Sequence, residues 1–391
     1  MTPFNNVLLT ARAERLRLTM RELNVPALLV LDPVNILYAS GAQNMMPFST
    51  RTPARYLLVF AEGPTLLFDY FGCEHLSAEL PTIDQTLPAL GLCYVSSGAD
   101  VEAASRQLAA QIVSIYAEQL GEVGTLAIDR FPMAVVDALR QLGFRLSDAD
   151  AVFSQARRIK MDVELDVIRE AIRRVETAVV AMEAAIVPGA TENAIWGEFQ
   201  REFIAGEGQY ITTRLAQSGP RTFPYFQQCS ARKIEQGDLF CLDTDALGYQ
   251  GYAVDFSRSF VCGRDSASGE QKELYAKAKD QLDHNIELFA VGRNYREIAE
   301  KAWAVPEQHQ DSRYYCIAHG LGMSGEYPNI PHLQTGVDYP LDGHVEGGMI
   351  FCVESYIGSE SSGQGVKLED QLLITETGVE RLSQYPFDPR F

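Results

Sequence analysis

Three aspartates lie close together in one short, apolar stretch of the chain. Asp243, Asp245 and Asp255 occur in FCLDTDALGYQGYAVDFSRSF, residues 240–260, among phenylalanine, leucine, valine and cysteine. Side chains alternate along a β-strand, so we expect Asp243 and Asp245 on the same face. If the chain turns near Tyr249, Asp255 lies opposite Asp243, and two facing carboxylates would destabilise the hairpin. A cation bound between them would remove this repulsion.

Two further carboxylates and one histidine have similar apolar neighbours. Glu354 occurs in GGMIFCVESYIG, Glu369 in GVKLEDQLLIT and His319 in CIAHGLGM. Each acidic residue alone could be an ordinary solvent-facing residue of a strand, and the histidine alone could be a buried core residue. The prediction of a metal site therefore depends on all of them occurring together. If they converge, unneutralised carboxylates would be costly or would hold protons. Carboxylates with one imidazole suit Fe, Zn, Mn or Co. We therefore predict two divalent transition-metal ions, held by Asp243, Asp245, Asp255, His319, Glu354 and Glu369.

The composition predicts a soluble globular protein without nucleic-acid or membrane partners. Of 391 residues, 46% are hydrophobic, and we see no apolar run long enough to cross a membrane. The net charge of −19 argues against binding nucleic acid or anionic lipid. We see no signal peptide, and the seven cysteines include no CxxC pair. We therefore expect reduced thiols in a cytoplasmic protein and no soft thiolate metal site.

The elements that must position the acidic residues fall into two expected domains. Residues 1–155 read as an α/β domain, with a helix in ARAERLRLTMRELN, a buried strand in VPALLVLD and a strand pair around ARYLLVFAEGPTLLFDY. From about residue 156, ARRIKMDVELDVIREAIRRVETAVVAMEAAIVPGATE predicts one long amphipathic helix that ends at Pro188. A strand-rich pattern follows from residue 209. Residues 156–391 are thus expected to form an α+β domain that carries all six candidate ligands.

Taken together, these motifs resemble the pita-bread metallohydrolase family, which includes methionine aminopeptidase, aminopeptidase P, prolidase and creatinase. LNVPALLVLDPVNILYASG is similar to the creatinase-type N-terminal domain, and RRIKMDVELDVIREA is similar to the start of the catalytic domain. The resemblance implies a pita-bread fold for residues 156–391 and a homodimer. The five metal ligands of the family match Asp243, Asp255, His319, Glu354 and Glu369 of this chain. Asp245 is an additional acidic residue that the family pattern lacks.

Three departures from the peptidases of this family bear on the reaction. Asp243 and Asp255 are twelve residues apart, where the family usually has eleven, and DTD replaces DxG. Tyr225 lies where the peptidases carry an upstream histidine, and Met323 replaces the second histidine of HGxGH. Peptide hydrolysis needs a proton donor for the departing amine and stabilisation of the tetrahedral intermediate. The chain therefore lacks groups that the family uses to cleave peptides.

The same departures resemble the branch of peptidase-like lyases that cleave dimethylsulfoniopropionate (DMSP) to dimethyl sulfide and acrylate. DTD, the single histidine of HGxGM and the upstream Tyr314 are similar to that branch. Its proposed base is an aspartate shortly after HGxGM, and Gly325 aligns with that position. The resemblance implies a lyase that acts on a small carboxylate such as DMSP or a related substrate. Tyr314 is a candidate base or hydrogen-bond partner.

Two other functions stay open. A metallohydrolase of Xaa-Pro dipeptides or of a small non-peptide amide would use Glu354 to relay a proton from metal-bound hydroxide. The third hypothesis is that the chain is a member of this family that has lost catalysis and serves as a binding protein. Candidate substrate-binding residues are Tyr225 and, in the loop QNMMPFSTRTPARY, Phe48 and Arg51. An ordinary surface loop is an equal interpretation of that segment.

Overall fold

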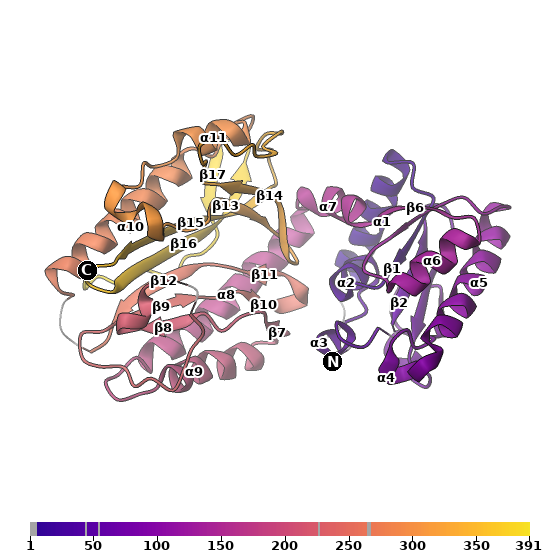
Figure 1. Cartoon of the computed structure of the whole chain (residues 1–391), viewed down its shortest axis with the longest axis horizontal. Coiled ribbons are helices and arrows are strands. Elements are labelled where there is room, and N and C mark those ends of the chain that lie inside the picture. The colour runs from indigo at the N-terminus through magenta and orange to yellow at the C-terminus, as the bar shows by residue number, and fades with distance from the viewer. Residues whose placement is uncertain (1–5, 44, 54, 226, 264–266) are drawn as a thin grey trace. The chain divides into compact units, whose positions relative to one another are not determined.

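The computed structural model describes residues 6–391 except 44, 54, 226 and 264–266. The chain divides into two compact units, Met1–Arg157 and Arg158–Phe391. Figure 1 shows a mixed α/β organisation in the first unit and long strands with helices in the second. No helix in the described part of the chain is long and apolar enough to cross a membrane.

The N-terminal unit is built on a six-stranded sheet of order β4-β3-β2-β1-β5-β6. The central strand β1 pairs antiparallel with β2 and parallel with β5. All four residues of β1 are buried, as expected for a strand covered on both faces. The strands are β1 (Ala27–Val30), β2 (Tyr56–Phe60), β3 (Thr65–Asp69), β4 (Gln85–Pro88), β5 (Thr125–Ile128) and β6 (Arg145–Asp148). The helices are α1 (Asn6–Glu22), α2 (Pro33–Ser40), α3 (Met46–Ser49), α4 (Tyr94–Ser97), α5 (Val101–Leu120), α6 (Met133–Gln141) and α7 (Asp150–Arg158).

The C-terminal unit contains a larger sheet, in which β14, β13, β15, β16, β12, β9 and β8 follow one another and β17 adds to β16. A separate small sheet has the order β11-β10-β7. The strands of the larger sheet are β8 (Ala216–Ser218), β9 (Leu239–Asp243), β12 (Ser257–Val261), β13 (Cys316–Leu321), β14 (Gly325–Pro331), β15 (Ile350–Ser359), β16 (Gln364–Thr375) and β17 (Gly378–Arg381). Those of the small sheet are β7 (Tyr210–Ile211), β10 (Ala246–Leu247) and β11 (Ala253–Val254).

The helices of this unit are α8 (Asp162–Ala184), α9 (Glu192–Ala205), α10 (Gly269–Glu287) and α11 (Tyr295–Lys301). The single long helix expected from about residue 156 is two helices, because α7 ends at Arg158 and α8 begins at Asp162. Glu164 caps the new start, since its carboxylate accepts a hydrogen bond from the Met161 backbone N–H at 2.9 Å. The apolar spacing continues across this break, so the sequence pattern does not show it.

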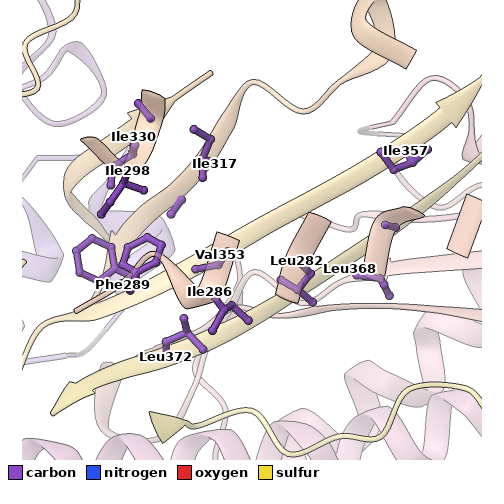
Figure 2. Close-up of a cluster of buried hydrophobic side chains, with 14 of the residues drawn as sticks. Leu282, Ile286, Phe289, Ile298, Ile317, Ile330, Val353, Ile357, Leu368 and Leu372 are labelled. Carbon is purple, nitrogen blue, oxygen red and sulfur yellow. The ribbon is translucent and has the colours of Figure 1, made fainter. Parts of the chain in front are cut away.

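The long β15–β16 hairpin separates an apolar core on one side from a buried polar cluster on the other. Side chains alternate along each strand, so Val353 and Leu368 face one way and their neighbours Glu354 and Glu369 face the other. Figure 2 shows Val353 and Leu368 in a cluster with Leu282 and other apolar residues, all of them buried. This core fixes the two strands that carry the acidic residues.

Candidate metal centre

One row of paired residues crosses four neighbouring strands. Asp243 on β9 is paired with Ser257 on β12, Ser257 is paired with Glu369 on β16, and Glu369 is paired with Glu354 on β15. Directly paired residues project to the same face of an antiparallel sheet. The pairing of these strands therefore brings three of the predicted ligands together, although Asp243 and Glu369 are 126 positions apart in the sequence.

Asp255 does not lie opposite Asp243, so the predicted register is wrong. Asp245 has a φ of +38°, which interrupts the strand after Asp243. The chain then pairs Ala246 with Val254 in the small sheet, and Asp255 falls between β11 and β12. Its backbone N–H donates to Gln371 Oε1 at 3.3 Å. Asp255 nevertheless reaches the other ligands, because its Oδ2 lies 3.7 Å from His319 Nε2.

His319 lies at the centre of one half of the site. It is located on β13, opposite Cys352 of β15. Its Nε2 is 3.5 Å from Glu354 Oε1 and 4.0 Å from Glu369 Oε1, and its Nδ1 lies 3.1 Å from the Gly320 carbonyl oxygen. Burial lowers the pKa of His319, but the hydrogen bond and charge of Glu354 and the charge of Glu369 outweigh it, and the pKa is raised to about 9.

The carboxylates crowd one another. Burial, followed by the charge of Glu369 and the other acidic residues, raises the pKa of Asp255 well above its usual value. Burial and the charge of Glu354 do the same to Glu369. Burial and Asp243 raise the pKa of Asp245 to about 6, although Thr213 Oγ1 donates to Asp245 Oδ2 at 2.7 Å. Without a further cation, the cluster would therefore hold protons.

Three of these oxygens are buried and have no hydrogen-bond partner among the described residues: Asp243 Oδ1, Asp255 Oδ1 and Glu369 Oε1. Buried polar atoms normally have a partner, so three orphans in one cluster point to a missing one. Ligand atoms of Asp255, His319, Cys352 and Glu369 also lie within 4.8 Å of one another. Oxygen and imidazole donors at this spacing fit a divalent transition-metal ion. The role of all six residues as metal ligands, Asp245 and Glu354 included, stays a prediction.

Cys352 is a residue that sequence reasoning missed. A thiolate site was not expected, because no two cysteines are close in sequence, yet one thiol lies within this group. Cys352 is two residues before Glu354 and faces the same way. Burial, followed by the charge of Asp255, raises the pKa of its thiol well above the usual value. The signal was available, since alternation along β15 places residues 352, 354 and 356 on one face.

Lys367 is the second residue that was missed. Its side chain is 4% exposed, and its Nζ donates to Glu354 Oε2 at 2.5 Å and to Glu369 Oε2 at 3.0 Å. Ser257 Oγ lies 2.8 Å away, and Asp243 Oδ2 lies 3.4 Å away. Burial opposes the charge of Lys367, but the charges of Asp243 and Glu354 raise its pKa well above the usual value. The centre thus contains a buried ammonium group.

Aromatic residues form one border of the centre. The Tyr314 ring lies 4.7 Å from Lys367 Nζ, 5.0 Å from the Tyr225 ring and 4.9 Å from the Tyr315 ring. Tyr225 also contacts Tyr356 at 4.9 Å. Burial, followed by the charge of Glu354, raises the pKa of Tyr314, which favours its protonated phenol. Tyr314 thus lies beside Lys367 and Tyr225 lies beside Tyr314, and their roles toward substrate stay predictions.

The position aligned with the lyase base is open. Gly325 begins β14, and a Cβ added there would meet no described atom within 4 Å. The adjacent Glu326 is held elsewhere, since its Oε2 accepts from Lys160 Nζ at 2.6 Å and both side chains are buried. Phe48 and Arg51 belong to the N-terminal unit. Phe48 is 50% exposed, with its ring 6.5 Å from that of Tyr70, and the substrate role of Phe48 and Arg51 stays a prediction.

Comparison with known proteins gives a consistent result along the whole chain. Residues 12–159 match the creatinase/prolidase N-terminal domain, and residues 166–376 match metallopeptidase family M24. The dimethylsulfoniopropionate lyase DddP of Roseovarius nubinhibens is 33% identical over 383 residues, which cover 97% of this chain and 86% of that protein. The Xaa-Pro dipeptidase of Pyrococcus furiosus is 25% identical over 95% of this chain and 97% of its own length.

Solved structures agree on the fold. The prolidase of Thermococcus sibiricus superposes with a TM-score of 0.76 at 21% sequence identity, covering 97% of this chain and 98% of that one. The predicted combination of an α/β creatinase-type domain and a pita-bread domain is therefore confirmed.

Proposed function

The chain belongs to metallopeptidase family M24, and we propose that it is a metal-dependent lyase acting on DMSP or a related small carboxylate. The observation that supports this most is the 33% identity to a DMSP lyase over 97% of the chain, against 25% to an Xaa-Pro dipeptidase. The replacement of the peptidase histidines by Tyr225 and Met323 points the same way. A family of metalloenzymes also favours catalysis over binding alone.

We propose two divalent ions in the centre, on grounds of charge. The five carboxylates and the ammonium of Lys367 leave four negative charges when His319 is neutral, and two divalent ions would balance them. The donors suit Fe, Zn, Mn or Co. When bound, such ions would polarise a substrate carboxylate and stabilise the negative charge that develops beside it. The residues that would hold them are Asp243, Asp245, Asp255, His319, Glu354 and Glu369.

The reaction requires one proton transfer and one bond cleavage. A base removes the proton from the carbon next to the substrate carboxylate, that electron pair forms the new C=C bond, and the C–S bond breaks with its pair on sulfur. The sulfonium therefore leaves as a neutral sulfide. Gly325, which aligns with the proposed base of the DMSP lyases, cannot act as a base because glycine has no side chain. Tyr314, as a protonated phenol, is suited to donate a hydrogen bond, and the rings of Tyr225 and Tyr314 would attract a sulfonium group.

The metallohydrolase function is the alternative, supported by the match to the Xaa-Pro dipeptidase of Pyrococcus furiosus. Glu354 would then accept the proton of the attacking water. Burial disfavours the charged form of Glu354, but Lys367 and His319 lower its pKa overall, which keeps it an acceptor. If the protein has this hydrolase activity, it should cleave the amide bond of a dipeptide such as Ala-Pro.

To test this, protein loaded with Fe, Zn or Mn is incubated with DMSP or with Ala-Pro. Dimethyl sulfide in the headspace is measured for DMSP, and free proline is measured for Ala-Pro. We expect sulfide, lost in Asp255→Ala and kept in Asp338→Ala, whose carboxylate is fully exposed. Proline without sulfide would replace the lyase proposal by the hydrolase. The absence of both products would remove DMSP and Ala-Pro as substrates.

We also propose a homodimer, as the family resemblance implies. Light scattering measures the mass of the protein in solution. A mass equal to that of one chain would contradict the homodimer.

A further inference from the structure

The chain between β8 and β9 carries Tyr225 to the aromatic border of the centre. Ser218 is the last residue of β8, and residues 219–229, which follow it, are called here the Tyr225 loop. The Tyr225 ring lies 5.0 Å from the Tyr314 ring and 4.9 Å from the Tyr356 ring. Tyr225 belongs to no helix or strand, so its position depends on how the loop is held.

One buried carboxylate holds both ends of this loop. Glu192 is the first residue of α9, and its side chain is fully buried. Its Oε1 accepts hydrogen bonds from the backbone N–H and from the hydroxyl of Ser218, both at 2.8 Å. Its Oε2 accepts from the backbone N–H of Ser230 at 2.9 Å and from the Ser230 hydroxyl at 2.6 Å. Glu192 therefore joins the residue before the loop to the residue after it.

Arg221, within the loop, completes the arrangement. Its Nε lies 3.2 and 3.1 Å from the two carboxylate oxygens of Glu192, and its Nη2 donates to the Gln228 carbonyl oxygen at 2.6 Å. Hydrogen bonds to a charged acceptor are stronger than those between neutral groups. Loss of the Glu192 charge would leave several donors without a good acceptor, which is costly where they are buried.

The same loop is attached to the strands that carry two of the predicted ligands. The Tyr356 hydroxyl on β15 donates to the Thr222 carbonyl oxygen at 2.6 Å, and the backbone N–H of Gly365 on β16 donates to Thr222 Oγ1 at 3.1 Å. Tyr225 is three residues beyond Thr222. A loop held at both ends and at Thr222 leaves the Tyr225 ring little freedom beside Tyr314.

We propose that Glu192 is a positioning residue, which fixes the Tyr225 loop and thereby sets the place of the Tyr225 ring at the border of the centre. This inference rests on the proposed function, in which the rings of Tyr225 and Tyr314 attract the cationic group of the substrate. The ring affects substrate binding and not the proton transfer. A loosened loop should therefore raise KM and leave kcat nearly unchanged.

The test compares Glu192→Gln with a matched control, Asp388→Asn. Asp388 is an equally buried carboxylate, held by Arg390 and by the Val261 backbone N–H. Hydrogen exchange measured by mass spectrometry should be faster in the Tyr225 loop of Glu192→Gln and unchanged there in Asp388→Asn. For DMSP, or for Ala-Pro if that is cleaved instead, KM of Glu192→Gln should rise at least about fivefold with kcat within about twofold. Asp388→Asn should keep the wild-type KM.

A double variant separates positioning from general destabilisation. Tyr225→Ala alone should raise KM, and Glu192→Gln added to it should raise KM by less than about twofold more, because residues that act through one another are not additive. If the two increases multiply, Glu192 does not act through Tyr225 and the inference is wrong. Ser230→Ala removes one donor to Glu192 and is the milder variant if Glu192→Gln does not fold; it should show the same direction of change in exchange and KM.

Unchanged exchange of the Tyr225 loop in the folded variants would overturn the inference, whether or not the protein is active. Wild type that releases neither dimethyl sulfide nor proline would instead overturn the proposed function. In that case the exchange comparison still decides whether Glu192 holds the loop.

Discussion

Two adjacent acids on β16 are both buried, yet they meet opposite environments. Asp370 projects to one face, where it accepts hydrogen bonds from Arg258 Nη2 at 2.8 Å, Arg381 Nη1 at 3.0 Å and Ser383 Oγ at 3.1 Å. Glu369 projects to the other face, where it shares Lys367 with Glu354 and where its Oε1 has no hydrogen-bond partner among the described residues. One carboxylate is saturated by cations, and its neighbour is not.

The difference separates structural charges from charges arranged for a ligand. A buried carboxylate with its own arginine needs nothing further, and Asp69 in the N-terminal unit is another example, held by Arg55 at 2.9 Å. A buried carboxylate that competes with others for one lysine keeps unused capacity to bind a cation. The comparison predicts that the two kinds of acid respond oppositely to substitution.

Glu369→Gln should have the largest effect, on metal binding. It removes the charge of a predicted ligand that lies near both Lys367 and His319, so we expect metal affinity to fall by about a hundredfold or more. Calorimetric titration of metal-free protein measures this. The free energy of unfolding of the metal-free variant should be unchanged or higher, because a source of repulsion is gone. Unchanged metal affinity would contradict the distinction between the two acids.

Asp370→Asn should show the opposite pattern. The substitution leaves Arg258, a fully buried guanidinium, without its carboxylate, and loss of one partner of a buried pair costs about 3–5 kcal/mol. Urea unfolding of the metal-free protein measures the loss, and Glu380→Gln, on an exposed pair with Arg169, is the matched control with little expected effect. Metal stoichiometry should be retained. A stable Asp370→Asn variant with lost metal would reverse the assignment of the two faces.

The pH dependence of stability offers a finer comparison. The pKa of His319 in the folded metal-free protein is raised to about 9, so its protonation stabilises the fold fully below pH about 6.5, and that contribution is lost as pH rises through 9. We expect the unfolding free energy of the metal-free protein to fall over this window, and His319→Gln to lack this component. Bound metal should suppress it, because a ligating imidazole is neutral. An identical profile with and without metal would contradict a role for His319 as ligand.

The smallest effects are expected in the loop of the N-terminal unit. Phe48→Ala and Arg51→Ala should raise KM for the substrate a few-fold and leave thermal stability unchanged, since both side chains are exposed. Steady-state kinetics would show this. If KM does not change, the segment is an ordinary surface loop.

Sequence patterns predicted α1, β1, the β2–β3 pair and the helical segment of α7 and α8, because apolar runs and their spacing report burial directly. They also led to the prediction that Asp243, Glu354 and Glu369 hold metal ions together, whereas the sheet face that the three share follows only from the strand register. The position of Asp255 was misjudged because a positive φ at Asp245 breaks the expected hairpin. Aspartate adopts positive φ more often than most residues but much less often than glycine, so its presence alone does not predict a break. Lys367 was missed because a lysine in a strand normally faces solvent, and only the register of β12, β15 and β16 shows that this one is enclosed.

The most direct test of a metal-dependent lyase removes and restores the metal in one preparation. The account predicts that DMSP gives dimethyl sulfide with loaded protein, none after chelation and dialysis, and recovery when Fe, Zn or Mn is returned. Sulfide release that persists in protein shown to be metal-free would contradict the central claim.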